Sequence, residues 1–231
     1  MLVALGCALS NWQTQRAHQK EAIEARLLSR ESTPAVPLPS LVDIAQMEYT
    51  RVILKGEFDG QWPVYLDNRP MNGLAGITVM MPFKLQNQER YVMVARGWVP
   101  RNNQDRAAIK PYLTPTGIIQ IEGILKANSG RVFQLGSAPA VRPKALVQNL
   151  ELDAFERSSH LPVYPFIVEQ TQSATDDGLL RDWPRASMGS DRHRGYAFQW
   201  LALAVMAFLF FVVTSFGKRD GRKPEQQREQ Q

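Results

Sequence analysis

A histidine beside a long apolar segment has the clearest potential for chemistry in this chain. His193 lies three residues before the uncharged run Tyr196–Phe216, and Ser190 and Asp191 just ahead of it suit the N-cap of a helix. In that helix one face carries the imidazole, a tryptophan and small side chains, namely His193, Ala197, Trp200, Ala204 and Ala207. Such a face lets another helix or a flat ligand approach, and the imidazole could ligate a haem iron. The alternative, favoured on these residues alone, is that His193 marks the membrane interface and the alanines pack a partner helix.

The second notable stretch is ArgGlyTrpValPro at residues 96–100, which ends an apolar strand pattern. One interpretation is structural, with a sheet edge closed by Pro100 and Arg96 held by a carboxylate. The other is a surface that meets an anionic group, such as a propionate, or a partner protein. The chemistry of these residues favours the structural interpretation over the binding surface, and both stay open at this point.

The remaining reactive residues do not form a known catalytic motif. The histidines are His18, His160 and His193, and Gly-x-Ser-x-Gly, His-Glu-x-x-His, Gly-x-Gly-x-x-Gly and Walker patterns are missing from the sequence. Because triads assemble in space, a hydrolase built on His160 stays open as a hypothesis, although nothing in the sequence points to one. The single cysteine, Cys7, excludes an internal disulfide framework and a Cys-rich metal site. We therefore expect a protein that is not an enzyme.

The run Tyr196–Phe216 predicts a transmembrane helix. At about 1.5 Å per residue it matches a bilayer core of roughly 30 Å. A basic flank follows at once, made of Lys218, Arg219, Arg222 and Lys223. Basic residues of this kind stay in the cytoplasm, so the large segment before the helix is expected outside it. We assign residues 186–217 to this helix with its interface and 218–231 to a basic cytoplasmic tail.

The N-terminus predicts a second, shorter contact with the membrane. Residues 1–11 start with a wholly apolar or small stretch that is too short to span a bilayer. We interpret them as the outer end of a first transmembrane helix, truncated in this numbering; the alternative is a half-buried anchor. Residues 12–40 are expected to form an exit helix, over Trp12–Arg30, followed by an extended Pro-rich tether.

Residues 41–185 are expected to form a β-rich domain. Alternating or apolar runs predict strands at Tyr49–Gly56, Ile77–Phe83, Tyr91–Val99, Gly117–Leu125, Val132–Leu135 and Val163–Val168. The segment Leu150–Arg157 predicts one short helix. The fold class is therefore an α+β membrane protein, with an antiparallel sheet or small barrel between two transmembrane helices. The net charge of +5 is spread along the chain and concentrated partly in the tail, which favours membrane topology over nucleic-acid binding.

Three motifs in this order resemble those of the Surfeit locus family, membrane proteins that assist the assembly of cytochrome c oxidase. They are Trp12-Gln13 with Arg16 and Lys20, ArgGlyTrpValPro at 96–100, and His193-x-x-Tyr196-Ala197-x-x-Trp200. Gly117 and the stretch Gly123-Ile124-Leu125 fit the strand that follows the second motif. Leu201 departs from the family pattern, which usually has another aromatic residue there. The resemblance covers nearly the whole chain.

The resemblance implies a non-enzymatic assembly factor of the inner membrane, with its central domain in the periplasm. It implies that haem a is bound and handed to the catalytic subunit of the oxidase, with His193 as the iron ligand and Tyr196 and Trp200 beside it. Partner contacts are expected from the two other motifs, through Trp12, Arg16, Arg96, Gly97 and Trp98. Expected partners are the oxidase catalytic subunit, the haem a synthesis machinery and the bilayer, but not nucleic acid. The alternative is a haem-free scaffold that stabilises an oxidase intermediate.

Overall fold

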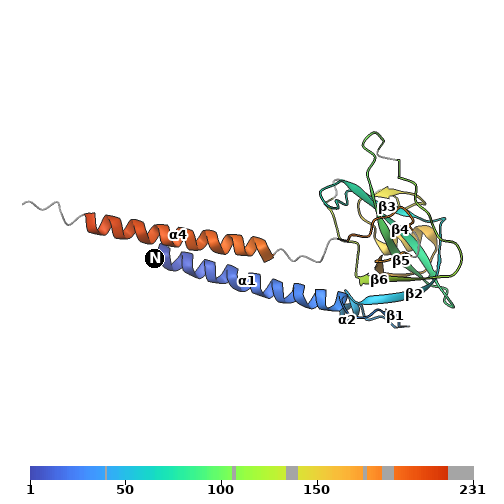
Figure 1. Cartoon of the computed structure of the whole chain (residues 1–231), viewed down its shortest axis with the longest axis horizontal. Helices are drawn as coiled ribbons and strands as arrows, with labels where there is room; N and C mark the ends of the chain where they lie inside the picture. Colours follow the sequence, from blue (N-terminus) through green and yellow to red (C-terminus); the bar gives the residue numbers. More distant parts are fainter. Residues whose placement is uncertain (40, 106–107, 134–139, 174–175, 184–189, 218–231) are drawn as a thin grey trace, which may run out of the picture. The chain divides into compact units, whose positions relative to one another are not determined.

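The computed structural model describes residues 1–39, 41–105, 108–133, 140–173, 176–183 and 190–217 (Figure 1). The chain divides into two compact units, one made of Met1–Arg26 with Ala186–Gln231 and the other of Leu27–Arg185. The first unit is built on two long helices and the second on a β-sheet. Helix α1 (Leu2–Glu31) begins in the first unit and ends in the second.

Helix α4 (Ser190–Gly217) confirms the helix predicted over the apolar run. In the described part of the chain it is the one helix long and apolar enough to cross a membrane, with a candidate span at Asp191–Ser215. Its large apolar side chains are mostly exposed, Phe198 and Phe210 both by 72%. A bare apolar surface of this extent is suited to lipid rather than to water.

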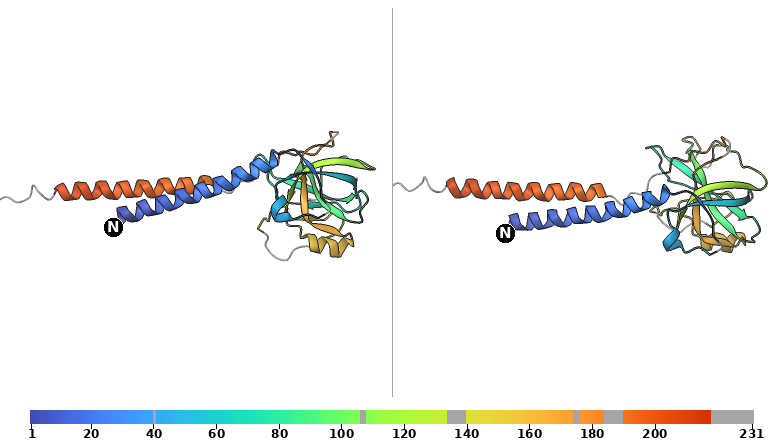
Figure 2. Two further views of the ribbon diagram at one scale, coloured as in Figure 1. Left: turned by 90° about the horizontal axis from the view of Figure 1, so that it is seen from below. Right: turned by 60° about the horizontal axis from the view of Figure 1, so that its bottom comes forward.

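Helix α1 unites two segments that the sequence analysis treated separately. The N-terminal apolar residues and the predicted exit helix form one continuous helix, which turns polar from Asn11 onward. Within the described residues α1 does not qualify as a span, so the expectation of two transmembrane helices is supported for α4 alone. Figures 1 and 2 both show α1 and α4 lying side by side.

Five strands of the second unit close into a small barrel. In order around it they are β2 (Arg51–Phe58), β6 (Ile119–Lys126), β8 (Val163–Gln170), β5 (Tyr91–Pro100) and β4 (Gly76–Leu85). Each strand is hydrogen-bonded to the next, and β4 pairs in turn with β2, which completes the circuit. Inward side chains such as Val52, Leu54 and Phe166 form the core of the barrel. Figure 2 shows the strands curving around this core.

Gly56 permits the closure of the barrel. Strand β2 pairs with β6 up to Gly56 and with β4 from Gly56 onward, so it changes partner at this residue. A Cβ at Gly56 would collide with the backbone carbonyl of Lys84 in β4. The two strands can approach this closely only because glycine has no side chain.

Shorter elements flank the five barrel strands. They are β1 (Val36–Pro37), α2 (Ile44–Met47), β3 (Val64–Leu66), β7 (Leu146–Val147) and α3 (Leu152–Ser159). Strands β3 and β7 extend the sheet beyond β4, and β1 pairs with β2. Helix α3 buries Phe155 in a second apolar cluster, which includes the outward side chains Met93 and Ile167.

The predicted strands are largely confirmed, and the sheet differs in two respects. The hairpin over Ile77–Phe83 and Tyr91–Val99 is present as β4 and β5. The sheet is mixed rather than antiparallel, because β8 returns to the barrel beside β5 in the parallel direction. The predicted strand at Val132–Leu135 is wrong for Val132 and Phe133, which lie in irregular chain; its last two residues fall outside the described residues.

Candidate functional site

The predicted small-residue face of α4 packs against α1. Ala197 and Ala204 on this face are 8% and 3% exposed, in contrast to the bare apolar side chains on the rest of the helix. Opposite Ala204 lies Gly6 of α1, where an added Cβ would come within 2.8 Å of the Ala204 Cβ. The Ser10 hydroxyl donates to the Ala197 carbonyl oxygen at 2.9 Å. Because Gly6 meets Ala204 and Ser10 meets Ala197, the two helices run antiparallel.

The same face places His193 against α1. The His193 Nδ1 lies 2.6 Å from the Gln13 side-chain oxygen Oε1, across 180 residues of sequence. With the Gln13 oxygen as the acceptor, a hydrogen bond at this distance needs the proton on the Nδ1 of His193. Beside this contact, the Arg194 Nε lies 2.7 Å from the Glu21 Oε1. A histidine and an ion pair thus connect the polar part of α1 to the start of α4.

An apolar groove continues along the helix pair. It measures about 480 Å³ and is lined by Leu2, Leu5, Gly6, Trp200, Leu203, Ala204, Met206, Ala207 and Phe210. Of the predicted cofactor-binding residues, Trp200 lines this groove, whereas His193 and Tyr196 do not. Tyr196 is 52% exposed on α4. The structure therefore supplies an imidazole and an apolar surface on one helix pair, at different levels.

These features fit a porphyrin in part. A metal-ligating histidine usually donates its other ring N–H to an acceptor, and the contact of the His193 Nδ1 with Gln13 is compatible with that arrangement. An apolar groove of this volume is in the range of ligand sites. The contact between Gly6 and Ala204, however, leaves no gap for a flat ring between the helices at that level. A porphyrin bound here would lie along the side of the pair.

The first motif is exposed on α1. Trp12 is 49% exposed, and the Arg16 guanidinium carbon lies 5.9 Å from the centroid of its ring. A cation held over an aromatic face forms a small, accessible surface feature. The prediction that these two residues contact a partner stays a prediction.

The second motif is buried in the barrel unit. Arg96 is 0% exposed, and its guanidinium donates to Asp177 Oδ2 at 3.0 Å, to the Leu113 carbonyl at 2.9 Å and to the Thr114 hydroxyl at 2.8 Å. The predicted carboxylate partner is therefore present. The guanidinium carbon of Arg96 also lies over the Phe58 ring, 4.6 Å from its centroid. The prediction of a sheet edge at residues 96–100 is wrong, because β5 pairs with β4 on one side and with β8 on the other.

Gly97 and Trp98 hold the same segment of chain as Arg96. A Cβ on Gly97 would come within 2.6 Å of the Leu179 Cβ, so the glycine lets that segment pass closely. The backbone of Trp98 exchanges two hydrogen bonds with Leu180, at 2.7 and 2.9 Å. Arg96, Gly97 and Trp98 thus all contact the segment Asp177–Leu180. Among the described residues, these contacts lie within the barrel unit. A partner contact by these three residues stays a prediction.

The carboxylate of Asp177 lies between two arginines. Arg181 donates to both of its oxygens, and the Arg181 Nη1 lies 3.0 Å from Oδ1. Burial alone would raise the pKa of Asp177, but the hydrogen bond and charge of Arg181, with the charge of Arg96, bring it below its usual value. The cluster therefore favours the ionised form of Asp177.

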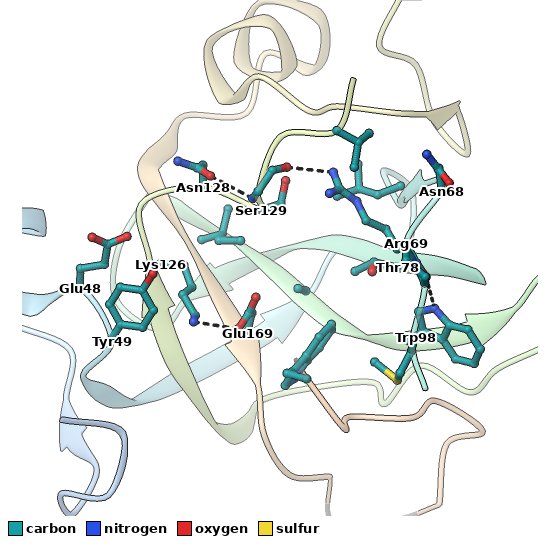
Figure 3. Close-up of a pocket in the computed structure, with 18 residues that line it drawn as sticks. Glu48, Tyr49, Asn68, Arg69, Thr78, Trp98, Lys126, Asn128, Ser129 and Glu169 are labelled. Atoms are coloured by element: carbon teal, nitrogen blue, oxygen red, sulfur yellow. Dashed lines mark hydrogen bonds and ion pairs between the residues drawn. The ribbon is translucent and has the colours of Figure 1, made fainter. Parts of the chain in front are cut away.

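A polar cleft opens on the outside of the barrel (Figure 3). It measures about 460 Å³. Lys126 lies in it, 3.5 Å from Glu169 and 4.0 Å from the centroid of the Tyr49 ring. Burial raises the pKa of Glu169, partly offset by the charge of Lys126. At the other end, Arg69 donates to the carbonyl oxygens of Gly130 and Gln148 at 3.0 Å. The charged groups of the cleft are thus engaged with groups of the same chain.

The hydrolase hypothesis gains nothing from the structure. It required His160 to meet a serine or cysteine. His160 instead caps α3 in the left-handed conformation, with φ of 58°. Among the described residues its ring is not hydrogen-bonded to a hydroxyl or thiol, and the neighbouring Ser159 hydroxyl donates to the Phe155 carbonyl.

Sequence reasoning missed the partners of the motif residues. Gln13 was noted only as part of a motif, and Asp177 was not singled out. The signal for Gln13 was its place beside Trp12 in a helix that must pack on another helix. Asp177 had no such signal, since it lies in an irregular segment 81 residues from Arg96.

Comparison with known proteins agrees with the motifs. Residues 1–205 match the SURF1 family. The SURF1-like protein of Monosiga brevicollis is 26% identical over 233 residues, which cover 92% of this chain and 85% of that protein. The Surfeit locus protein 1 of Rattus norvegicus is 26% identical over 226 residues, covering 90% and 72%. The SURF1-like protein of Rickettsia felis is 28% identical over 220 residues, covering 92% and 91%. The chain therefore belongs to the SURF1 family.

Proposed function

We propose that this chain is a non-enzymatic assembly factor for cytochrome c oxidase, which binds haem a on its helix pair and helps deliver it to the catalytic subunit. Haem a is the cargo, and it supplies an iron that needs an axial ligand. The observation that carries the proposal is the fixed imidazole of His193, with Nδ1 held by Gln13 at 2.6 Å, beside the apolar groove of α1 and α4.

The residues of the helix pair suit temporary binding. A single histidine leaves the opposite iron position open to exchange, which favours transfer over storage. The groove is open along one side of two helices, so the apolar cargo can enter and leave laterally from lipid. Trp200 lines this groove and offers an aromatic plane to the cargo. Tyr196 lies outside this groove, three residues after His193, and we assign it to a contact with the cargo beside the imidazole.

The proposed setting is the inner membrane, with the start of α1 and most of α4 in the bilayer, the basic tail in the cytoplasm and the barrel in the periplasm. Three features support it: the apolar surface of α4, the apolar start of α1, and the basic residues that follow α4 in sequence. In this arrangement His193 lies near the outer boundary of the membrane, and Trp12 and Arg16 face the same boundary from α1. We assign those two residues to contacts with the oxidase or with the haem a synthesis machinery.

A haem-free scaffold is the second candidate. It is favoured by the close contact of Gly6 with Ala204, which fills the space between the helices with protein. In that case the small residues of α4 serve to pack α1, and His193 serves to fix the two helices through Gln13. The scaffold would stabilise an oxidase intermediate by protein contacts alone.

Haem content separates the two candidates. The full chain is co-expressed with haem a synthesis, purified in detergent, and examined by absorption spectroscopy. We expect a Soret band in the unaltered protein and its loss in His193→Ala. His18→Ala is the matched control, because His18 also lies on the helix pair and is exposed; its band should persist. A colourless unaltered protein would favour the scaffold, whereas a full band in His193→Ala would show that haem binds without this histidine as its ligand.

A further inference from the structure

Gln13 is the one side chain of α1 that touches the imidazole of His193 through a hydrogen bond. Its Oε1 lies 2.6 Å from Nδ1, and both side chains are half-buried. The contact is bracketed by the Ser10 to Ala197 hydrogen bond on one side and the Glu21 to Arg194 ion pair on the other. The histidine is therefore held by a residue whose own position is fixed within the helix pair.

The type of acceptor matters for what His193 can do. An amide oxygen is neutral and accepts only, so it selects the tautomer with the proton on Nδ1 and leaves Nε2 as the ligating atom. A carboxylate in the same place would push more electron density into the ring and make it a stronger ligand. A neutral acceptor orients the ring without that added strength, which suits a cargo that must be released.

We propose that Gln13 is a positioning residue that sets the tautomer of His193 and thereby tunes its strength as an iron ligand. The inference rests on the proposed function for its ligand, but the tautomer itself does not depend on haem. The alternative is that Gln13 only links the two helices. In that case, replacing its amide by another group would change neither the tautomer of His193 nor the properties of bound iron.

The first test uses the haem-free, detergent-solubilised full chain with ¹⁵N-labelled histidine. The chain has three histidines, and His193→Ala identifies the signal of interest. We expect His193 to carry its proton on Nδ1 in the unaltered protein and to become a mixture of tautomers in Gln13→Leu. Ser10→Ala is the matched control, since it removes the neighbouring hydrogen bond between the helices and should leave the tautomer unchanged. An Nε2-protonated ring in the unaltered protein, or no change in Gln13→Leu, would overturn the proposal.

The second test adds ferric haem a to the same variants. We expect Gln13→Leu to bind about 10- to 100-fold more weakly, as for other residues that orient a metal ligand. Gln13→Glu should bind at least as tightly as the unaltered protein and move the midpoint potential of the iron to more negative values. Equal weakening in both variants with an unchanged potential would overturn the tuning role. If the unaltered protein binds no haem, the proposed function fails, while the tautomer measurement still decides the role of Gln13.

Discussion

The two units use their motif residues in opposite ways. In the barrel, Arg96 is fully buried and its guanidinium meets a carboxylate, a carbonyl and a hydroxyl. On the helix pair, His193 is only half-buried, and its Nδ1 contacts the Gln13 side chain at 2.6 Å. A sequence motif can therefore mark either a fully buried cluster or a half-exposed contact between two helices.

Burial decides between these two roles. A buried charge needs hydrogen-bonding partners, and in Arg96 both terminal guanidinium nitrogens are engaged within the barrel unit, while Nε has no partner among the described residues. A half-exposed histidine is not under that constraint, and one contact is enough to orient it. The variants below are ordered by the size of the effect that this contrast predicts.

Removing the buried cation should have the largest effect. In Arg96→Met the carboxylate of Asp177 loses one of its two arginines and two further hydrogen bonds of the cluster disappear. We expect a loss of about 3–5 kcal/mol in the free energy of unfolding of the barrel, as for other broken buried pairs. Urea unfolding of the full chain in detergent, followed by near-UV circular dichroism, measures it.

Arg51→Met is the control for this variant. Arg51 pairs with Glu122 at 2.9 Å, but both side chains are about one-third exposed, at 28% and 31%. An exposed pair contributes about 1 kcal/mol or less. Similar losses in the two variants would show that burial does not set the role of Arg96.

Two glycines test close packing in the two units. Gly97→Ala places a Cβ within 2.6 Å of the Leu179 Cβ and should destabilise the barrel by about 1–3 kcal/mol.

Gly6→Ala places a Cβ within 2.8 Å of the Ala204 Cβ and should separate α1 from α4 without changing the unfolding of the barrel. Disulfide formation between Ser10→Cys and Ala197→Cys, in a Cys7→Ser background, reports on the helices. A weakened barrel in Gly6→Ala would mean that the units are not independent.

Lowering the pH should reduce the free energy of unfolding of the barrel through protonation of Asp177, and this is the smallest of the expected effects because Asp177 stays ionised near neutral pH. The pKa of Asp177 is lowered in the folded state, so its ionised form stabilises the fold above about 4, the unfolded value, and this contribution is lost as pH falls toward the folded pKa. Arg181→Met removes the main cause of the lowering and should move this loss to higher pH. Unfolding midpoints measured from pH 7 to pH 3 test it; identical acid profiles would contradict the assignment.

Local patterns predicted the strands well and their pairing less well. The alternation in β2 follows from one buried face, and the apolar runs of β4 and β5 follow from burial on both faces. The parallel pairing of β5 with β8 depends on where the chain returns after α3, which no local pattern records. The very short strands β3 and β7 are too brief for any period to show.

For the site, too, local sequence patterns predicted some features and missed others. The helical period correctly placed Ala197 and Ala204 on a face that packs a partner helix. The structural interpretation of residues 96–100 predicted that a carboxylate would hold Arg96, and Asp177 does so. The identities of Gln13 and Asp177 came only from the structure, since each is brought to its partner by the fold across many residues.

The antiparallel pairing of the first helix with the last has a consequence for biosynthesis. Gln13 leaves the ribosome near the start of translation and His193 near its end, 180 residues later. The whole barrel is therefore synthesised before the histidine can meet its acceptor. Chains interrupted at any earlier point lack His193 and most of α4, so unfinished copies cannot form the contact between the two helices.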